Sequence, residues 1–194
     1  MRVHRFDIDG LMLIEPKRFR DRRGFFAETY DAAELANHGV DIGFVHDAQL
    51  LSTAPGTVRG LYFQGPPFGQ ARLIRVVQGA VQQVAVDMRQ GSPTFGRHVS
   101  VALSGENGLQ LFIPEGFAHG SATLRPLTEV AYKVSTADVP GCQQGVLWND
   151  PFLGIEWPLK PDEAVMSEAD AALPLLCDIE TPFRWPAPRK EEAA

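Results

Sequence analysis

The chain has 194 residues, of which 44% are apolar and 22% are charged. This length and composition are typical of one globular domain with a sizeable hydrophobic core. The net charge of −6 argues against a nucleic-acid-binding surface and against a polybasic membrane patch. It does not exclude an anionic ligand, because a few local arginines can hold a phosphate on an acidic protein.

The N-terminal segment and the cysteines bear on the compartment. Residues 1–26 contain no uninterrupted apolar stretch and no small-residue cleavage site of the kind that signal peptides have. No run approaches the roughly 18 apolar residues of a membrane span. Cys142 and Cys177 are far apart and are the only cysteines, which favours reduced thiols. We therefore expect a cytoplasmic protein with no membrane partner.

Short apolar, β-branched or alternating runs recur along the chain between glycines and prolines. They cover residues 3–8, 11–15, 72–77, 80–87, 98–103, 109–113 and 128–134. Such spacing predicts an all-β barrel or sandwich. Residues 72–87 are further interpreted as a β-hairpin that turns near Gln78 and Gly79.

Helical patterns are short and peripheral. Residues 31–37 begin with Asp31 as a candidate N-cap and end before Gly39, and residues 167–172 begin with Ser167 as a second candidate cap. We expect one domain over residues 1–185 and a polar C-terminal tail over residues 186–194.

One motif identifies the kind of barrel. The spacing Gly108-x5-Pro114-x-Gly116-x2-His119 is the second sequence motif of cupin barrels, in which the histidine begins a strand and points into the barrel mouth. It predicts a cupin-type jellyroll with short peripheral helices. The region around Tyr62 lacks the further histidines and glutamate of metal-binding cupins, and one imidazole cannot supply a three- or four-ligand site. We therefore expect no metal and no other cofactor; His119 is then a pocket histidine or a buried core histidine.

Several further motifs occur in a fixed order over about residues 3–185. They are DRRGFFAE at 21–28, VRGL at 58–61, VAVDMR at 84–89, GSPT at 91–94, IPEGFAHG at 113–120, Tyr132-Lys133, and WNDP at 148–151 followed by Trp157-Pro158. In these motifs the chain resembles the dTDP-4-dehydrorhamnose 3,5-epimerases, a metal-free cupin family of nucleotide-sugar metabolism.

The resemblance implies a ligand and a partner. The substrate of the family is a 4-keto-6-deoxy sugar on a nucleoside diphosphate, whose C3 and C5 protons are acidic because the C4 ketone can become an enolate. By this resemblance Arg23, Phe26 and Glu28 contact the nucleotide, and Arg59 contacts the diphosphate. It also implies a homodimer with exchanged strands, in which N-terminal residues of one subunit help to bind the nucleotide of the other.

The resemblance also assigns the catalytic positions. In the family a histidine oriented by an aspartate removes the proton, a lysine stabilises the enolate oxygen, and a tyrosine on the opposite face returns a proton. Tyr132 matches that tyrosine, Asp170 matches the orienting aspartate, and His119 matches a second pocket histidine. The base position holds Tyr62, and the lysine position holds Arg72. A further pocket carboxylate of the family corresponds here to Gln83.

Tyrosine at position 62 changes the expected chemistry. An unperturbed phenol has a pKa near ~10, so at pH 7 only about 0.1% is phenolate, a deficit of roughly 4 kcal/mol for a base. Arg59 and Arg72 would lower this pKa, whereas Asp170 would raise it and accept a hydrogen bond from the neutral phenol.

Three functions remain open at this stage. The first is an epimerase- or isomerase-like enzyme that enolises a nucleotide-linked keto sugar with an altered base. The second is a non-catalytic nucleotide-sugar-binding protein. The third is a cupin enzyme for a different carbonyl metabolite.

Overall fold

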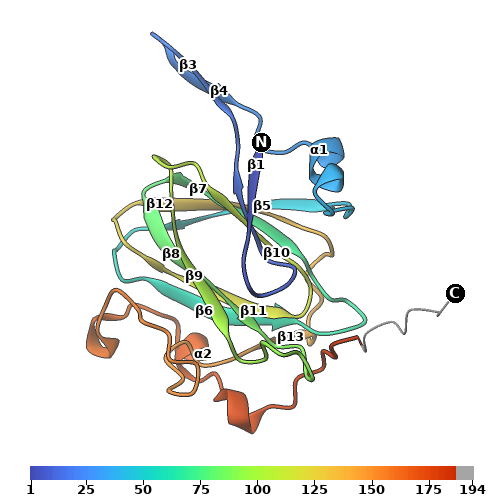
Figure 1. Ribbon diagram of the computed structural model, residues 1–194. Helices are drawn as coiled ribbons and strands as arrows, with labels where there is room; N and C mark the ends of the chain where they lie inside the picture. Colours follow the sequence, from blue (N-terminus) through green and yellow to red (C-terminus); the bar gives the residue numbers. More distant parts are fainter. Residues whose placement is uncertain (187–194) are drawn as a thin grey trace, which may run out of the picture.

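The structure, a computed structural model, describes residues 1–186 and consists mainly of two β-sheets that face each other (Figure 1). The six-stranded sheet has the order β1-β2-β10-β7-β12-β5, and the five-stranded sheet has the order β13-β6-β11-β8-β9. The strand pairs within both sheets are antiparallel. This confirms the predicted all-β jellyroll barrel with short peripheral helices.

The first sheet contains β1 (Arg2–Arg5), β2 (Met12–Glu15), β5 (His46–Ser52), β7 (Arg72–Gln78), β10 (Gln110–Ile113) and β12 (Thr128–Val134). The second sheet contains β6 (Val58–Gln64), β8 (Ala80–Asp87), β9 (His98–Ser104), β11 (Phe117–Thr123) and β13 (Gln143–Gly145). Outside the sheets lie the hairpin strands β3 (Arg18–Asp21) and β4 (Gly24–Ala27), the helices α1 (Ala32–Asn37) and α2 (Glu168–Ala171), and two 3-10 turns, η1 (Pro161–Glu163) and η2 (Leu176–Asp178).

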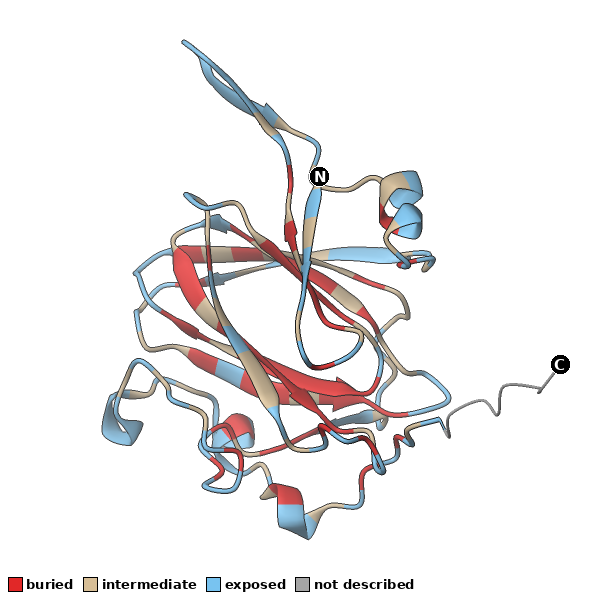
Figure 2. Ribbon diagram, viewed as in Figure 1, coloured by how far each residue is buried: buried red, intermediate tan, exposed pale blue. Residues whose placement is uncertain are grey.

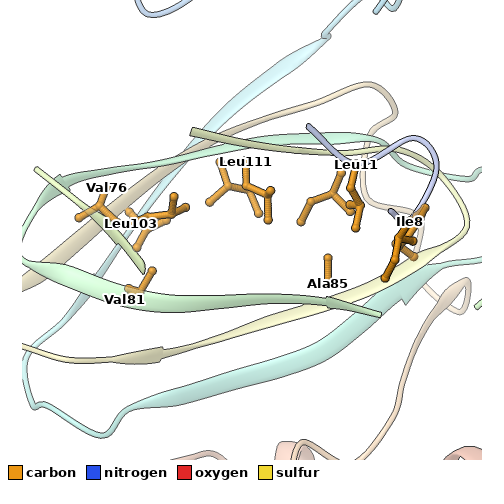
Figure 3. Packing of buried hydrophobic residues seen from close by; sticks show 11 residues of the cluster. Ile8, Leu11, Val76, Val81, Ala85, Leu103 and Leu111 are labelled. Atoms are coloured by element: carbon orange, nitrogen blue, oxygen red, sulfur yellow. The ribbon is translucent and has the colours of Figure 1, made fainter. Parts of the chain in front are cut away.

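The core fills the space between the two sheets. Val76 and Leu111 from the first sheet meet Val81, Ala85 and Leu103 from the second (Figure 3). Because alternate residues of a strand share a face, position 83 points to the same side of β8 as positions 81 and 85. The sequence alternation of β8 therefore directs Gln83 into the interior of the barrel.

The other face of β8 is buried as well. Val84 and Val86 pack with Leu61 of β6 and, from the C-terminal segment, with Leu176 and Phe183. The chain therefore returns after β13 to cover the outer side of the second sheet. The single domain over residues 1–185 stays a prediction, and residues 187–194 of the expected tail lie outside the described part of the chain.

The predicted hairpin over residues 72–87 is wrong. β7 pairs with β10 and β12 in the first sheet, whereas β8 pairs with β9 and β11 in the second. The turn at Gly79 instead carries the chain from one sheet to the other. Gly79 has a φ of +77°, and a Cβ there would lie 2.3 Å from Thr128 Oγ1 and 2.9 Å from Thr128 Cα, so only glycine fits this crossover.

Both predicted helices are present with their predicted caps. Asp31 accepts a hydrogen bond from the backbone N–H of Glu34 at the start of α1, and Ser167 accepts one from that of Asp170 at the start of α2. Each cap satisfies a backbone N–H that the first helical turn leaves without a partner. None of the helices in residues 1–186 is both long enough and apolar enough to cross a membrane.

The hairpin β3–β4 projects away from the two sheets (Figure 1) and is mostly exposed (Figure 2). Its aromatic residues Phe19, Phe25 and Phe26 are 50%, 53% and 62% exposed. Five cations and one carboxylate lie within residues 17–23 of a chain whose net charge is −6. The hairpin is thus a basic and aromatic arm on an acidic protein.

Candidate functional site

A cavity of about 200 Å³ lies between the two sheets, and six of the ten predicted site residues line it. The second sheet contributes Arg59, Tyr62, Gln83 and His119, and the first sheet contributes Arg72 and Tyr132. The remaining lining is mainly apolar and includes Leu50, Ile74 and Val130. Two opposing walls of polar side chains therefore enclose the space in which a ligand would bind.

Tyr62 and His119 lie side by side on the second sheet, because they are paired residues of β6 and β11. The two strands approach closely at Gly60, where a Cβ would lie 2.6 Å from the carbonyl oxygen of His119. Gly60 also has a φ of +107°, which side chains rarely tolerate. The glycine of the VRGL motif thus sets the close spacing of the two strands.

The Tyr62 hydroxyl donates a hydrogen bond to Asp170 Oδ1. Asp170 is only 5% exposed, and its Oδ2 accepts a hydrogen bond of 2.9 Å from the hydroxyl of Ser167. Burial, this hydrogen bond and the carboxylate charge raise the pKa of Tyr62 well above its ordinary value. Near neutral pH Tyr62 is therefore a neutral phenol that keeps its proton and directs it at Asp170 Oδ1 in a hydrogen bond. Asp170 lies behind Tyr62 and does not itself line the cavity.

His119 is 8% exposed. Burial and the nearby charge of Arg72 lower the pKa of its imidazole well below the ordinary value. The ring is therefore neutral near pH 7 and has a nitrogen that can accept a proton, although burial and Arg72 also make it a weaker base than an exposed imidazole. Among residues 1–186, it is the only imidazole that lines this cavity.

Arg72 reaches the cavity from the opposite sheet. Its guanidinium carbon lies 5.0 Å from the ring centroid of Tyr132, and its Nε donates a hydrogen bond of 2.7 Å to Gln70 Oε1. Burial lowers the pKa of Arg72, but an arginine remains charged in proteins. The guanidinium and the Tyr132 phenol thus form one cationic and proton-donating wall.

Gln83 is 2% exposed, and its amide nitrogen donates a hydrogen bond of 2.9 Å to the carbonyl oxygen of Gly120. A neutral amide in this position adds neither a charge nor a proton acceptor of useful strength. Gln83 therefore shapes the cavity but supplies no acid–base group.

The structure does not bring the predicted nucleotide contacts to this cavity within one chain. Arg23 lies on the projecting hairpin, where it pairs with Asp21 at 2.7 Å. Phe26 and Glu28 line a separate hollow of about 440 Å³, together with Arg75 and Lys133 among others. Their separation from Arg59 means that one copy of the chain does not assemble the whole predicted site.

Gln70 is a site residue that the sequence analysis missed. It contacts Arg72 through its side-chain oxygen and Asp138 through its side-chain nitrogen. The available signal was its spacing, because residues two apart on an extended segment lie on the same side.

Two further observations concern the thiols and the side chains that could bind a metal ion. Cys142 and Cys177 are free thiols, as expected. Within the described residues, no group of three or more His, Cys, Asp or Glu side chains is arranged to hold a metal ion.

The family model for dTDP-4-dehydrorhamnose 3,5-epimerase matches residues 5–178 of the chain. The chain belongs to the dTDP-4-dehydrorhamnose 3,5-epimerase family. It is 44% identical to the dTDP-4-dehydrorhamnose 3,5-epimerase of Sinorhizobium fredii over 178 residues, which are 92% of this chain and 91% of the relative.

Two solved structures of the dTDP-4-dehydrorhamnose 3,5-epimerase family have the same fold. The enzyme of Bacillus anthracis, solved with TDP and PPi bound, is 44% identical, with a TM-score of 0.87 over 90% of this chain and 98% of that one. The epimerase of Legionella pneumophila, solved in complex with dTDP-4-keto-L-rhamnose, is 40% identical, with a TM-score of 0.91 over 96% of this chain and 99% of that one.

Proposed function

We propose that this protein is an epimerase that acts on a dTDP-4-keto-6-deoxy sugar by enolisation next to the C4 ketone, with an altered base. The observation that carries the proposal is the convergence of polar groups from both sheets on one cavity. His119 stands on one wall, and Arg72 and Tyr132 stand on the other. Inversion of a carbon centre needs a proton acceptor and a proton donor on opposite faces of the sugar, and this arrangement supplies both.

The altered base in this proposal is His119. Its neutral imidazole accepts the proton from the carbon next to the ketone, and the electrons of the C–H bond form the enolate. The guanidinium of Arg72 stabilises the enolate oxygen. The Tyr132 phenol then donates its proton to the opposite face of the same carbon, which restores the ketone with the centre inverted. The imidazolium and the tyrosinate return to their starting states by exchange with water.

Tyr62 does not serve as the base in this proposal. Proton removal by a phenol requires its phenolate form, which already costs roughly 4 kcal/mol at pH 7 for an unperturbed tyrosine. Burial and Asp170 add to that cost, because they raise the pKa of Tyr62 further. With its proton directed at Asp170, the phenol oxygen can instead accept a hydrogen bond from a sugar hydroxyl.

The nucleotide part of the ligand requires a second copy of the chain. Arg59 lines the cavity and is suited to the diphosphate, because a guanidinium binds phosphate oxygens in pairs. Arg23 and Phe26 lie on the exposed arm, away from Arg59. We propose a homodimer in which the arm of each chain reaches the cavity mouth of the other by strand exchange.

Proton exchange in D2O tests the reaction. The protein is incubated in D2O with dTDP-4-keto-6-deoxyglucose, and deuterium at C3 and C5 is followed by NMR. Because one imidazole serves one position, we expect deuterium at one of the two carbons. Tyr132→Phe is expected to retain this incorporation but to lose the inverted product. Deuterium at neither carbon, with intact folding, would exclude enolisation.

Two observations favour a second candidate, a binding protein without turnover. The base position holds a phenol that is locked as a hydrogen-bond donor, and the amide of Gln83 is engaged with the backbone. This candidate predicts saturable binding of dTDP-4-keto-6-deoxyglucose in a calorimetric titration with no deuterium incorporation. The same two measurements therefore separate the two functions.

A further inference from the structure

Gln70 connects the Arg72 guanidinium to the segment that follows β12. Its Oε1 accepts the hydrogen bond from Arg72 Nε at 2.7 Å. Its Nε2 donates to the carbonyl oxygen of Thr136 at 2.6 Å and to Asp138 Oδ1 at 3.0 Å. Both ends of the amide are therefore engaged, and the side chain has one orientation in which all three contacts are made.

These contacts keep Arg72 directed into the cavity. Among residues 1–186, Asp138 is the only carboxylate within 4.0 Å of the guanidinium, and the separation from Arg72 Nη2 is 4.0 Å, which is longer than a hydrogen bond. The Asp138 side chain is 61% exposed, whereas that of Arg72 is 17% exposed. Without Gln70, Arg72 could move toward solvent and form a direct ion pair with Asp138. That movement would turn the guanidinium away from Tyr132.

We propose that Gln70 is a positioning residue that holds the Arg72 guanidinium inside the cavity beside Tyr132 and away from Asp138. The proposal rests on the function proposed above, in which Arg72 stabilises the enolate oxygen. Displacement of a stabilising group by about 1 Å can reduce a rate by on the order of a hundredfold. An effect of Gln70 on Arg72 should therefore appear in kcat and leave nucleotide binding unchanged.

The test compares three variants with the wild-type protein. Gln70→Leu removes the acceptor, and we expect the rate of deuterium incorporation at saturating substrate to fall by about ten- to a hundredfold, with KM little changed. Gln70→Glu keeps an acceptor for Arg72 Nε and is expected to restore most of the rate. In Gln70→Leu combined with Asp138→Asn, the competing carboxylate is absent, and part of the rate should return.

Gln64 offers a matched control. It binds the same segment, because its side chain accepts a hydrogen bond from the Val139 backbone N–H and donates one to the Ala137 carbonyl, but it is not hydrogen-bonded to Arg72. Gln64→Leu should therefore leave the rate near that of the wild-type protein once the folded fraction is equal. An equal loss in Gln64→Leu and Gln70→Leu would overturn the proposal, because Gln70 would then act only by fixing the segment.

A second readout does not depend on activity. The Arg72 Nε–H signal in a 15N NMR spectrum, assigned by its loss in Arg72→Lys, should be protected from solvent exchange in the wild-type protein. We expect the protection to be lost in Gln70→Leu and kept in Gln70→Glu and Gln64→Leu. If the wild-type protein incorporates no deuterium, the proposed reaction fails, and this signal still decides the role of Gln70. Undiminished protection in Gln70→Leu would overturn it.

Discussion

At residue 62 a phenol occupies the position at which the family resemblance implies a histidine base. Its hydroxyl is committed to Asp170, so the same aspartate that would orient an imidazole here holds a phenol proton. The neighbouring strand of the same sheet contains a neutral imidazole at His119. The side chain that can accept a proton therefore lies on β11, the strand next to β6.

Restoring the implied residues gives a first prediction. Tyr62→His with Gln83→Asp places an imidazole beside Asp170 and a carboxylate inside the cavity. We expect this double variant to incorporate deuterium from D2O faster than the parent, because the new base has a pKa near ~6.5. If a well-folded double variant is no faster, the remaining cavity does not position the substrate for a base at residue 62.

The buried imidazole also predicts a pH dependence of stability. The pKa of His119 is lowered in the folded protein, so the unfolded chain takes up a proton below about pH 6.5 that the folded protein does not. The contribution of His119 to stability is therefore complete above that pH and declines as the pH falls toward its folded pKa, by up to about 1.4 kcal/mol per pH unit. His98, whose pKa burial also lowers, acts in the same direction.

Urea unfolding between pH 7 and pH 5 measures this effect. His119→Gln should reduce the decline in the free energy of unfolding over this range. The exposed His4 provides the control, and His4→Gln should retain the decline of the wild-type protein. An unchanged pH dependence in His119→Gln would contradict a lowered pKa.

Much of the candidate site was predictable from residue identities, but its assembly was not. Five strands, β6, β7, β8, β11 and β12, carry Tyr62, Arg72, Gln83, His119 and Tyr132 respectively, and the motifs around these residues identified them individually. The position of Arg23 and Phe26 relative to Arg59 depends on where the hairpin points, which no local pattern encodes. Gln70 was missed because its role follows from contacts with residues 136 and 138, far away in the sequence.

At the scale of elements, periodicity predicted the strands better than their partners. The runs at residues 80–87 and 128–134 coincide with β8 and β12, because alternation and β-branching are local properties. The predicted pairing of β7 with β8 was wrong. A turn at Gly79 is compatible with either a hairpin or a crossing between sheets, so the local sequence does not distinguish them. The close approach of Thr128, which distinguishes the two, is a long-range contact.

The crossover makes Gly79 a specific test of the topology. Gly79→Ala forces a side chain into a left-handed conformation, which alone costs roughly 1–2 kcal/mol, and it also clashes with Thr128. We expect a loss of at least that size in the free energy of unfolding by urea. Gly43→Ala is the control, because nothing lies within 4 Å of a Cβ at Gly43. Equal stability of the two variants would contradict the crossover geometry.

At the scale of the whole molecule, the main feature is the arm formed by β3 and β4, which projects away from the two sheets of its own chain (Figure 1). Its three phenylalanines are at least half exposed, and Phe19 and Phe26 are paired residues of β3 and β4. Exposed apolar groups gathered on a charged arm are typical of an interaction surface. An acidic second copy would complement its cations. The strand pattern of residues 18–27 was overlooked because the hairpin has no face buried within its own chain.

The arm predicts a change in oligomeric state. On the proposed homodimer, we expect wild-type protein to elute as a dimer and Phe25→Ser with Phe26→Ser to elute as a monomer in size-exclusion chromatography with light scattering. The same double variant should bind dTDP at least about tenfold more weakly, because the partner would no longer complete the site. Phe152→Ser is the control, since Phe152 is 73% exposed and lies outside the arm. A dimer that persists in the double variant would place the interface elsewhere.

The most direct test of a relocated base compares two variants in the D2O experiment with dTDP-4-keto-6-deoxyglucose. His119→Gln removes the proposed base, and Tyr62→Phe removes only the phenol oxygen. The account predicts that His119→Gln abolishes deuterium incorporation whereas Tyr62→Phe retains it. Incorporation that survives in His119→Gln but disappears in Tyr62→Phe would contradict it and assign the base to Tyr62.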